Sequence, residues 1–338
     1  KSQIILIAVG TPTQKDGHAN LRYVFSAAKQ IAPFLSGYTV VVNKSTVPVG
    51  TARQVASILA KNHKNADFDV AANPEFLREG SAIEDFMRPN RVVIGVDSAR
   101  AKKIMRELYR PLFLIETPII FTSPQTAELI KYASNAFLAT KITFINQIAD
   151  LCEKSGADVH DVAKSMGLDR RIGDKFLHPG PGFGGSCFPK DNLELVATAK
   201  KLGAPIGLIE EVISFNKSRK KRMAKKIISA CGNNVKGKKI AILGLTFKPN
   251  TDDMRDSPSL DIIPILQKSG AKIQAYDPEG MEEAKIYLRK VKWCSNPYET
   301  LDGAEALVLL TEWNHCLLYT SDAADERSSV DLGGRRII

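Results

Sequence analysis

The sequence lacks the features of a membrane or disulfide-bonded protein. No apolar stretch approaches the roughly 20 residues needed to cross a bilayer, and the charged start at Lys1 leads into a strand-like run rather than a signal peptide. The five cysteines are widely spaced and form no CxxC pair, so they indicate neither a disulfide framework nor a metal site. We therefore expect a cytoplasmic protein with no membrane partner.

Aromatic residues are scarce at 7%, whereas basic residues are in excess and give a net charge of +10. Such a charge attracts the phosphates of a small ligand as readily as nucleic acid. The densest basic run has helical spacing and comprises Lys217, Arg219, Lys220, Lys221, Arg222, Lys225 and Lys226. Because few aromatics lie nearby, the run is typical of a solvated helix face, and we expect no nucleic-acid partner.

Strand-like and helical patterns alternate over the first part of the chain. Short apolar runs occupy 4–9, 38–42, 68–72, 92–96 and 118–121, and helical patterns occupy 21–34, 51–60 and 101–109. Strands alternating with helices indicate an α/β domain with a mainly parallel sheet.

A long helix should follow, because no Gly or Pro interrupts the chain from Pro124 to about Glu153. Lys131 and Asn135 fall on one face of it, and that face continues with Leu138 and other apolar residues. A polar pair on an apolar stripe should be covered. Further helices are predicted at 159–165, 193–201 and 206–230.

A second α/β pattern begins at Lys239. Its strands are predicted at 239–243, 273–276 and 306–310, with a helix after Ser257 and Pro258, where Ser can cap and Pro fits the first turn. The residues from Cys316 onward abandon this pattern, and no element is assigned to them.

The loop from His178 to Asp191 is the most informative stretch. It is rich in glycine, which lets a backbone approach a ligand closely. Cys187 lies near its end, where the loop meets the next helix. A lone cysteine is more often a small core residue than a nucleophile. A helix start and the nearby Lys190, however, favour a thiolate, which makes Cys187 a candidate nucleophile.

Seven segments, in this order, resemble the UDP-glucose/GDP-mannose dehydrogenase family. They are 9–12 (VGTP), 45–51 (STVPVGT), 73–80 (NPEFLREG), 127–137 (AELIKYASNAF), 169–173 (DRRIG), 184–191 (GGSCFPKD) and 244–249 (GLTFKP). One short motif is weak, but seven in register are specific. The resemblance covers about residues 1 to 315.

The resemblance implies two Rossmann-like α/β units joined by a long central helix and a helical middle domain. The implied domains are 1–122, the remainder of an NAD-binding unit; 123–215, a helical dimerisation domain with the catalytic loop; 216–315, a UDP-sugar-binding unit; and 316–338, an aberrant tail.

The implied activity is the NAD-dependent four-electron oxidation of a nucleotide sugar, most like the branch that converts UDP-glucose to UDP-glucuronate. Cys187 would attack the C6 aldehyde, and the resulting thiohemiacetal would be oxidised to a thioester. Lys131 and Asn135 would stabilise the oxyanion. Asp191 would position water or assist proton transfer, and Glu75 would act as general acid and base in hydrolysis.

The resemblance also implies the binding residues. Catalytic residues are expected to be Cys187, Lys131, Asp191, Glu75, Asn135 and Thr46. Cofactor contacts are expected from Thr11, Thr46, Glu79, Lys190 and Arg255. Substrate contacts are expected from Glu75, Phe76, Leu77, Lys131, Asn135, Arg171, Phe183, Gly184, Gly185, Phe247 and Lys248. Arg171 would reach the substrate phosphate of a neighbouring subunit, which implies a homodimer or larger homo-oligomer with the long helix as interface.

One departure from the family concerns the cofactor. No GxGxxG follows a first strand, and no acidic residue follows at the spacing that reads an adenosine ribose. We expect a chain that lacks an N-terminal nucleotide-binding segment, leaves its first Rossmann-like unit incomplete and binds NAD poorly.

Three alternatives remain open from the sequence. The substrate could be GDP-mannose or UDP-N-acetylmannosamine. The protein could be a two-electron β-hydroxyacid dehydrogenase, which shares the Lys-x-x-x-Asn helix but needs no cysteine. It could also be a non-enzymatic nucleotide-sugar or RNA-binding protein, whose binding would depend strongly on salt and not on Cys187.

Overall fold

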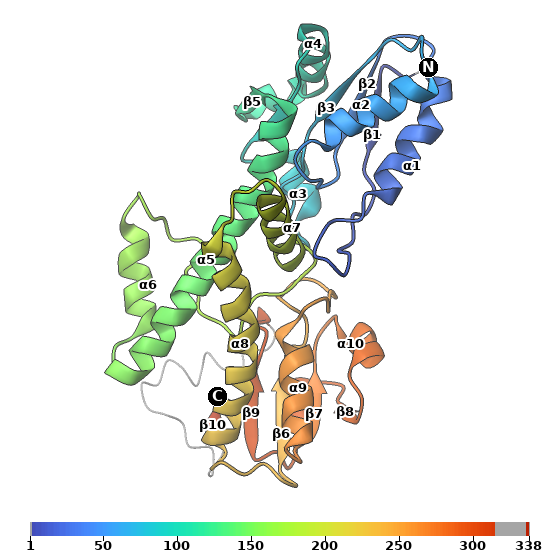
Figure 1. Ribbon diagram of the computed structural model, residues 1–338. Helices are drawn as coiled ribbons and strands as arrows, with labels where there is room; N and C mark the ends of the chain where they lie inside the picture. The colour runs from blue at the N-terminus through green and yellow to red at the C-terminus, as the bar shows by residue number, and fades with distance from the viewer. Residues whose placement is uncertain (1, 315–335, 338) are drawn as a thin grey trace. The chain divides into compact units, whose positions relative to one another are not determined.

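The structure is a computed structural model that describes residues 2–314, 336 and 337 (Figure 1). The chain forms two compact units. Unit 1 comprises residues 1–137 and 190–207, and unit 2 comprises 138–189 and 208–338. The division into three domains stays a prediction.

Unit 1 contains a five-stranded sheet of order β1-β2-β3-β4-β5. Neighbouring strands are parallel except for β3 and β4, which confirms the mainly parallel sheet. The strands are β1 (Ile4–Ile7), β2 (Thr39–Asn43), β3 (Phe68–Ala72), β4 (Val92–Gly95) and β5 (Ile119–Thr122). Every residue of β2 is buried, as expected for a central strand covered on both faces.

The helices of unit 1 cover the sheet through two apolar clusters. One cluster joins Val24 and Ala28 to Val55 and Leu59, and the other contains Met105. The helices are α1 (Arg22–Ile31), α2 (Thr51–Asn62), α3 (Ala82–Met87) and α4 (Ala99–Leu108), with 3₁₀ segments η1 (Ala32–Phe34) and η2 (Arg110–Ile115). The pattern of short apolar runs did not predict α3, which has no buried residue.

Two helices have residues in both units. α5 (Pro124–Ser155) is the uninterrupted helix that the sequence predicted. α7 (Phe188–Lys201) begins five residues earlier than the pattern at 193–201 indicated, because Pro189 fits a first helical turn. The remaining helices of the central region are α6 (Val159–Leu168) and α8 (Gly207–Ala230). Within the described ranges, no helix combines the length and apolar character that spanning a membrane requires.

Unit 2 contains a parallel sheet of order β10-β9-β6-β7-β8. Its strands are β6 (Lys239–Leu243), β7 (Lys272–Tyr276), β8 (Val291–Trp293), β9 (Ala306–Leu309) and β10 (Arg336–Ile337), and its helices are α9 (Pro258–Lys268), α10 (Met281–Tyr287) and α11 (Pro297–Leu301). Ser257 caps α9 by accepting a bond from the Ser259 N–H, as predicted.

The end of the chain corrects one expectation. Residues 316–338 were assigned no element, yet β10 pairs in parallel with β9. Two residues are too few for a periodic pattern to reveal; only the partner strand defines them. The rest of the predicted tail lies outside the described residues.

Candidate active site

Cys187 ends the glycine-rich loop and stands directly before α7. Its side chain is partly exposed, and its Sγ lies 3.6 Å from the Ser186 Oγ. Backbone N–H groups at a helix start stabilise negative charge. The local structure therefore gives Cys187 both access and an environment suited to a thiolate.

The glycines before Cys187 serve packing inside unit 2. A Cβ on Gly184 would lie 2.3 Å from the Asp256 carbonyl oxygen, and a Cβ on Gly185 would lie 2.7 Å from the Phe247 ring. Gly185 also has a φ of +84°, which favours glycine. The backbone at these two glycines therefore approaches Asp256 and Phe247 closely, and their contact with a ligand stays a prediction.

In unit 1, Lys131 forms a buried ion pair. Its side chain is 3% exposed, and its Nζ lies 3.1 Å from a carboxylate oxygen of Glu75, in the loop after β3. The other Glu75 oxygen accepts the Leu77 N–H at 2.5 Å. The Phe76 ring centroid lies 5.5 Å from the same ammonium. Lys131 is thus a fixed cation, covered as its helical face predicted.

Asn135, one turn after Lys131 on α5, contacts the first turn of α7. Its Nδ2 donates to Asp191 at 2.6 Å, and the Lys190 Nζ lies 2.6 Å from the other Asp191 oxygen. Asp191 is 1% exposed. Unit 1 therefore groups five predicted site residues into two polar clusters: Glu75 with Lys131, and Lys190 and Asp191 with Asn135.

The carboxyl ends of β1 and β2 carry Thr11 and Thr46. The Thr11 hydroxyl donates to the Thr46 carbonyl at 2.9 Å, which joins the two loops. Lys44 lies beside them, and burial lowers its pKa to about 8. Ligands of open α/β sheets bind at the carboxyl ends of the strands. These two loops fit that rule.

The buried Glu194 on α7 holds the loop after β1. It accepts the Ala19 N–H, lies 3.3 Å from His18 Nδ1 and accepts the Thr198 hydroxyl at 2.7 Å. The same helix carries Asp191, so one element supports both the Thr11 loop and the Asp191 cluster. No pattern along the sequence indicated this contact.

Glu128, a turn before Lys131 on α5, binds the start of α2. Its carboxylate accepts the Gly50 N–H at 2.6 Å and the Ala52 N–H at 2.8 Å. Burial raises its pKa to about 7, against the lowering effect of these two N–H groups. Glu128 and Lys131 line a small cavity together with Asn43 and Ser45. Glu128 lies in a segment that suggested the family, but no role had been predicted for it.

The remaining predicted residues are dispersed. Arg171 is 89% exposed and pairs with Asp169 at 2.6 Å, and Arg255 is exposed and pairs with Asp253 at 2.9 Å. The Lys248 Nζ lies 5.6 Å from the Phe247 ring centroid. Glu79 is partly buried in the loop before α3.

Phe183 is mainly a structural anchor. Its ring lies in a buried cluster with Ala139 and Val212 and meets Phe188 edge-on, with the ring centroids 6.0 Å apart. Its backbone N–H and carbonyl both bond to the Asn216 side chain.

The basic helix corrects a second expectation. Lys217, Lys221, Arg222, Lys225 and Lys226 are exposed, as predicted, but Arg219 and Lys220 are buried. Arg219 pairs with Asp150, and Lys220 donates to the Asp256 carbonyl and lies 3.4 Å from Asp261. These two residues face the interior of unit 2 because its acceptors lie there.

Asp277, at the end of β7, is a second polar centre that the sequence did not reveal. It accepts the N–H groups of Leu245 and Thr246 after β6, and those of Glu279 and Gly280 after β7. The Trp313 Nε1 donates to it as well, at 3.1 Å. Asp277 fixes the turn that leads to Phe247 and Lys248.

Thr11 and Thr46 lie at the carboxyl ends of β1 and β2, and the hydroxyl of Thr11 is taken by the Thr46 carbonyl. Their contact with NAD stays a prediction. The start of α2, which could hold a pyrophosphate, already holds the Glu128 carboxylate. Over 2–314, no three His, Cys, Asp or Glu side chains are grouped to hold a metal ion.

Unit 1 is thus an α/β unit with a buried lysine, and unit 2 carries a partly exposed thiol. Comparison with known families gives three matches in chain order. The UDP-glucose/GDP-mannose dehydrogenase family's NAD binding domain matches residues 1–113, its central domain 125–218 and its UDP binding domain 241–330. The chain belongs to this family. The last match extends beyond residue 315, where the sequence resemblance was expected to end.

Individual relatives agree. The chain is 57% identical to a UDP-glucose 6-dehydrogenase of Rhizobium meliloti (strain 1021) over 316 residues, which cover 93% of this chain and 72% of the relative. It is 52% identical to UDP-glucose 6-dehydrogenase TuaD of Bacillus subtilis (strain 168), over 92% of this chain and 67% of that protein.

A solved structure is also similar. A UDP-glucose dehydrogenase from Pyrobaculum islandicum superimposes with a TM-score of 0.88 at 39% identity, covering 93% of this chain and 73% of that one. The α/β class with two Rossmann-like sheets and a helical centre, predicted from the sequence, is confirmed.

Proposed function

We propose that the protein oxidises UDP-glucose to UDP-glucuronate in two successive steps at C6. The observation that carries the proposal is Cys187, a partly exposed thiol at the start of α7 in a chain 57% identical to a UDP-glucose 6-dehydrogenase. NAD, when bound, accepts one hydride in each oxidation. All other groups in the reaction come from the protein, the sugar and water.

The thiol makes the second oxidation possible. The Cys187 thiolate adds to the C6 aldehyde, forming a C–S bond and an oxyanion. Loss of hydride from C6 converts the thiohemiacetal to a thioester. Water then cleaves the C–S bond, giving the carboxylate and returning the thiol. Without a nucleophile the reaction would stop at the aldehyde level, so the thiol determines the number of electrons transferred.

Lys131 and Asn135 are proposed to stabilise the oxyanion. A preorganised cation counts for most where water is excluded, and the 3% exposure of Lys131 supports this role. Asn135 is oriented by Asp191, whose oxygen it contacts at 2.6 Å. Asp191 is proposed to position the hydrolytic water. Glu75, which is partly exposed, can exchange protons with solvent and is proposed as general acid and base.

The binding roles are those that the resemblance to the family implies. Thr11, Thr46, Glu79, Lys190 and Arg255 are proposed to contact the cofactor. Phe76, Leu77, Phe183, Gly184, Gly185, Phe247 and Lys248 are proposed to contact the nucleotide sugar, with Phe183 acting through its backbone because its ring is buried.

We further propose a homodimer formed along α5. Phe137, Phe144 and Leu151 recur every seven residues on this helix and are exposed. The exposed Arg171 would then contact the substrate phosphate of the second subunit. Light scattering tests the assembly: Phe144→Glu combined with Leu151→Glu should give monomers, and an unchanged mass would rule out this interface.

The test of the function is the number of NADH formed per UDP-glucose by the wild-type enzyme, by Cys187→Ser and by the control Cys231→Ser. The wild type and the control should form two NADH, and Cys187→Ser should stall after the first oxidation. A wild type that forms a single NADH would instead indicate a two-electron hydroxyacid dehydrogenase. Faster oxidation of GDP-mannose or UDP-N-acetylmannosamine under the same conditions would make that sugar the substrate in place of UDP-glucose.

A further inference from the structure

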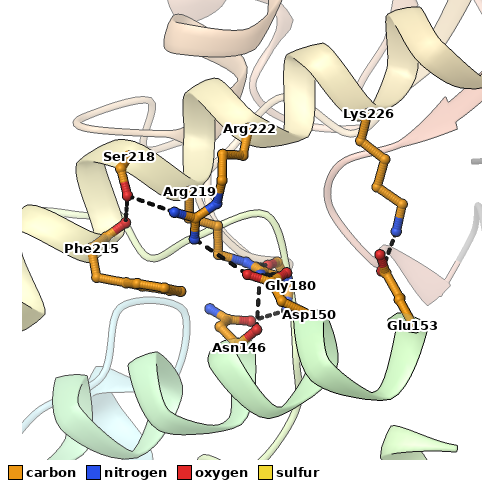
Figure 2. Close-up of polar contacts among 9 residues, drawn as sticks. All are labelled: Asn146, Asp150, Glu153, Gly180, Phe215, Ser218, Arg219, Arg222 and Lys226. Carbon is orange, nitrogen blue, oxygen red and sulfur yellow. Dashed lines mark hydrogen bonds and ion pairs between the residues drawn. The ribbon is translucent and has the colours of Figure 1, made fainter. Parts of the chain in front are cut away.

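The glycine-rich loop is held at Gly180 by side chains from two helices, and these residues all belong to unit 2 (Figure 2). The Gly180 N–H donates to the Asn146 Oδ1 at 2.8 Å, and the Gly180 carbonyl accepts the Arg219 Nε at 2.6 Å. Asn146 lies on α5 and Arg219 on α8. Both polar groups of one loop residue are therefore taken by side chains from different helices.

Arg219 is built into this position. Its side chain is 5% exposed, and its Nη1 donates to the Asn146 carbonyl at 2.9 Å and to Asp150 at 2.7 Å. Burial lowers its pKa, and Asp150 opposes that effect. Burying a guanidinium costs desolvation free energy, which its hydrogen bonds must offset. The planar guanidinium does so by donating to three acceptors at once.

A second contact holds the same loop three residues later. The Asn216 Oδ1 accepts the Phe183 N–H at 2.8 Å, and the Asn216 Nδ2 donates to the Phe183 carbonyl at 3.0 Å. Asn216 precedes Arg219 by three residues on α8, so both side chains lie on one face of that helix. One stripe of α8 thus fixes the loop at two points.

The outer side of the loop at Gly180 remains open. A Cβ added to Gly180 would meet no atom within 4 Å, whereas one on Gly182 would lie 2.9 Å from the Asn216 Oδ1. The loop is thus packed tightly where Asn216 holds it and uncrowded at Gly180.

We infer that Arg219, together with Asn146 and Asn216, positions the glycine-rich loop for binding of the nucleotide sugar. The inference rests on the proposed function, in which this loop contacts the substrate. A loop fixed before binding loses less conformational entropy when substrate arrives. Loss of the contacts should therefore weaken binding more than it slows the chemical step.

Neighbouring ion pairs on the same helices provide matched controls. Arg222 lies 3.3 Å from Asp150 and 4.5 Å from the Phe215 ring centroid, and Lys226 pairs with Glu153 (Figure 2). Both basic side chains are exposed. Asp150 and Glu153 lie on α5 and Phe215 lies on α8, so these contacts are outside the loop.

The experiment compares Arg219→Ala, Arg219→Lys, Arg222→Ala and Lys226→Ala in the full chain. Affinity for UDP-glucose is measured by calorimetry, and KM and kcat by NADH formation. Arg219→Ala should raise Kd and KM about tenfold or more, with a smaller change in kcat. Arg219→Lys should be intermediate, because it keeps the charge but cannot make all three contacts. The two controls should match the wild type.

Amide hydrogen exchange separates positioning from general damage. In Arg219→Lys, a peptide covering 177–187 should exchange faster, while peptides from β6 and β7 remain as protected as in the wild type. If Arg219→Ala does not fold, Asn146→Ala provides the same comparison, because it removes the acceptor of the Gly180 N–H. A KM for Arg219→Ala no higher than for Arg222→Ala, or a fall in kcat alone, would overturn the inference. A wild type that does not bind UDP-glucose would instead contradict the proposed function.

Discussion

Each unit has a buried carboxylate that binds backbone N–H groups at the carboxyl end of a parallel strand. In unit 1, Glu128 accepts two N–H groups at the start of α2. In unit 2, Asp277 accepts four backbone N–H groups around the ends of β6 and β7, and the Trp313 Nε1 as well. In nucleotide-binding folds such N–H groups often receive a phosphate. In both units these N–H groups donate to a protein carboxylate instead.

The surroundings of the two carboxylates differ. Glu128 lies near ionisable groups, because Lys131 lines the same cavity and the charge of Arg53 acts on the Glu128 carboxylate. Asp277 instead accepts from backbone N–H groups, from the Trp313 indole and from the Thr246 hydroxyl. We infer that the polar centre of unit 1 serves chemistry, whereas that of unit 2 fixes the turn presenting Phe247 and Lys248. Substitutions in the unit 1 centre should then lower catalysis, and substitutions of Asp277 should lower stability.

The largest expected effect is on catalysis in unit 1. Lys131→Met should lower kcat about 10²- to 10³-fold, the range observed when a preorganised oxyanion donor is removed. Glu75 loses its cation but is partly exposed, so water can replace the lost contact and stability should change little. Steady-state kinetics and thermal melting measure the two properties. Lys61→Met on the exposed end of α2 is the control, and a variant that melts far below it with normal kcat would contradict a chemical role.

Asp277→Ala should instead act on stability. Removing the carboxylate leaves several buried N–H groups without an acceptor, each costing about 1–3 kcal/mol, and these costs are not additive. We expect a loss of about 3 kcal/mol or more, measured as a lower urea midpoint at constant m-value. Asp277→Asn, which keeps one acceptor oxygen, should lose less. Glu305→Ala, an exposed site on the same unit, should change stability by less than about 0.5 kcal/mol; an equal loss there would remove the contrast.

The sequence predicted the main elements for identifiable reasons. Apolar runs such as 68–72 matched strands residue for residue, and the absence of Gly and Pro from Pro124 to about Glu153 predicted α5 to within two residues of its end. Short elements such as β8 and α11 escaped because a few residues carry no period. The face shared by Lys131 and Asn135 also followed from helical spacing.

The polar partners were harder to predict. The resemblance supplied Glu75 and Asp191, but neither Glu128 nor Asp277 was assigned a role. Arg219 was interpreted as solvated because it lies in a basic run with helical spacing and few aromatics nearby. Its partners Gly180 and Asp150 are distant in sequence. Such roles depend on which backbone group a side chain meets after folding. Composition and periodicity do not contain that information.

The smallest and most specific expected effect concerns pH and Glu128. Its pKa rises from an ordinary 4.5 to about 7 on folding, so the native state binds the proton more tightly than the unfolded state. The resulting stability is fully present below pH 4.5 and is lost as the pH rises to about 7, a change of about 3 kcal/mol. Lys44 acts in a separate window: its lowered pKa reduces stability as the pH falls from 10.5 through about 8.

Glu128→Gln isolates this effect, because glutamine does not titrate. Urea unfolding of both proteins between pH 4.5 and 8 should show the wild type losing stability relative to the variant up to about pH 7, then a constant difference. Parallel pH curves for wild type and Glu128→Gln would mean that the two N–H groups keep Glu128 ionised throughout, and the contrast between the two units would then rest on Lys131 alone.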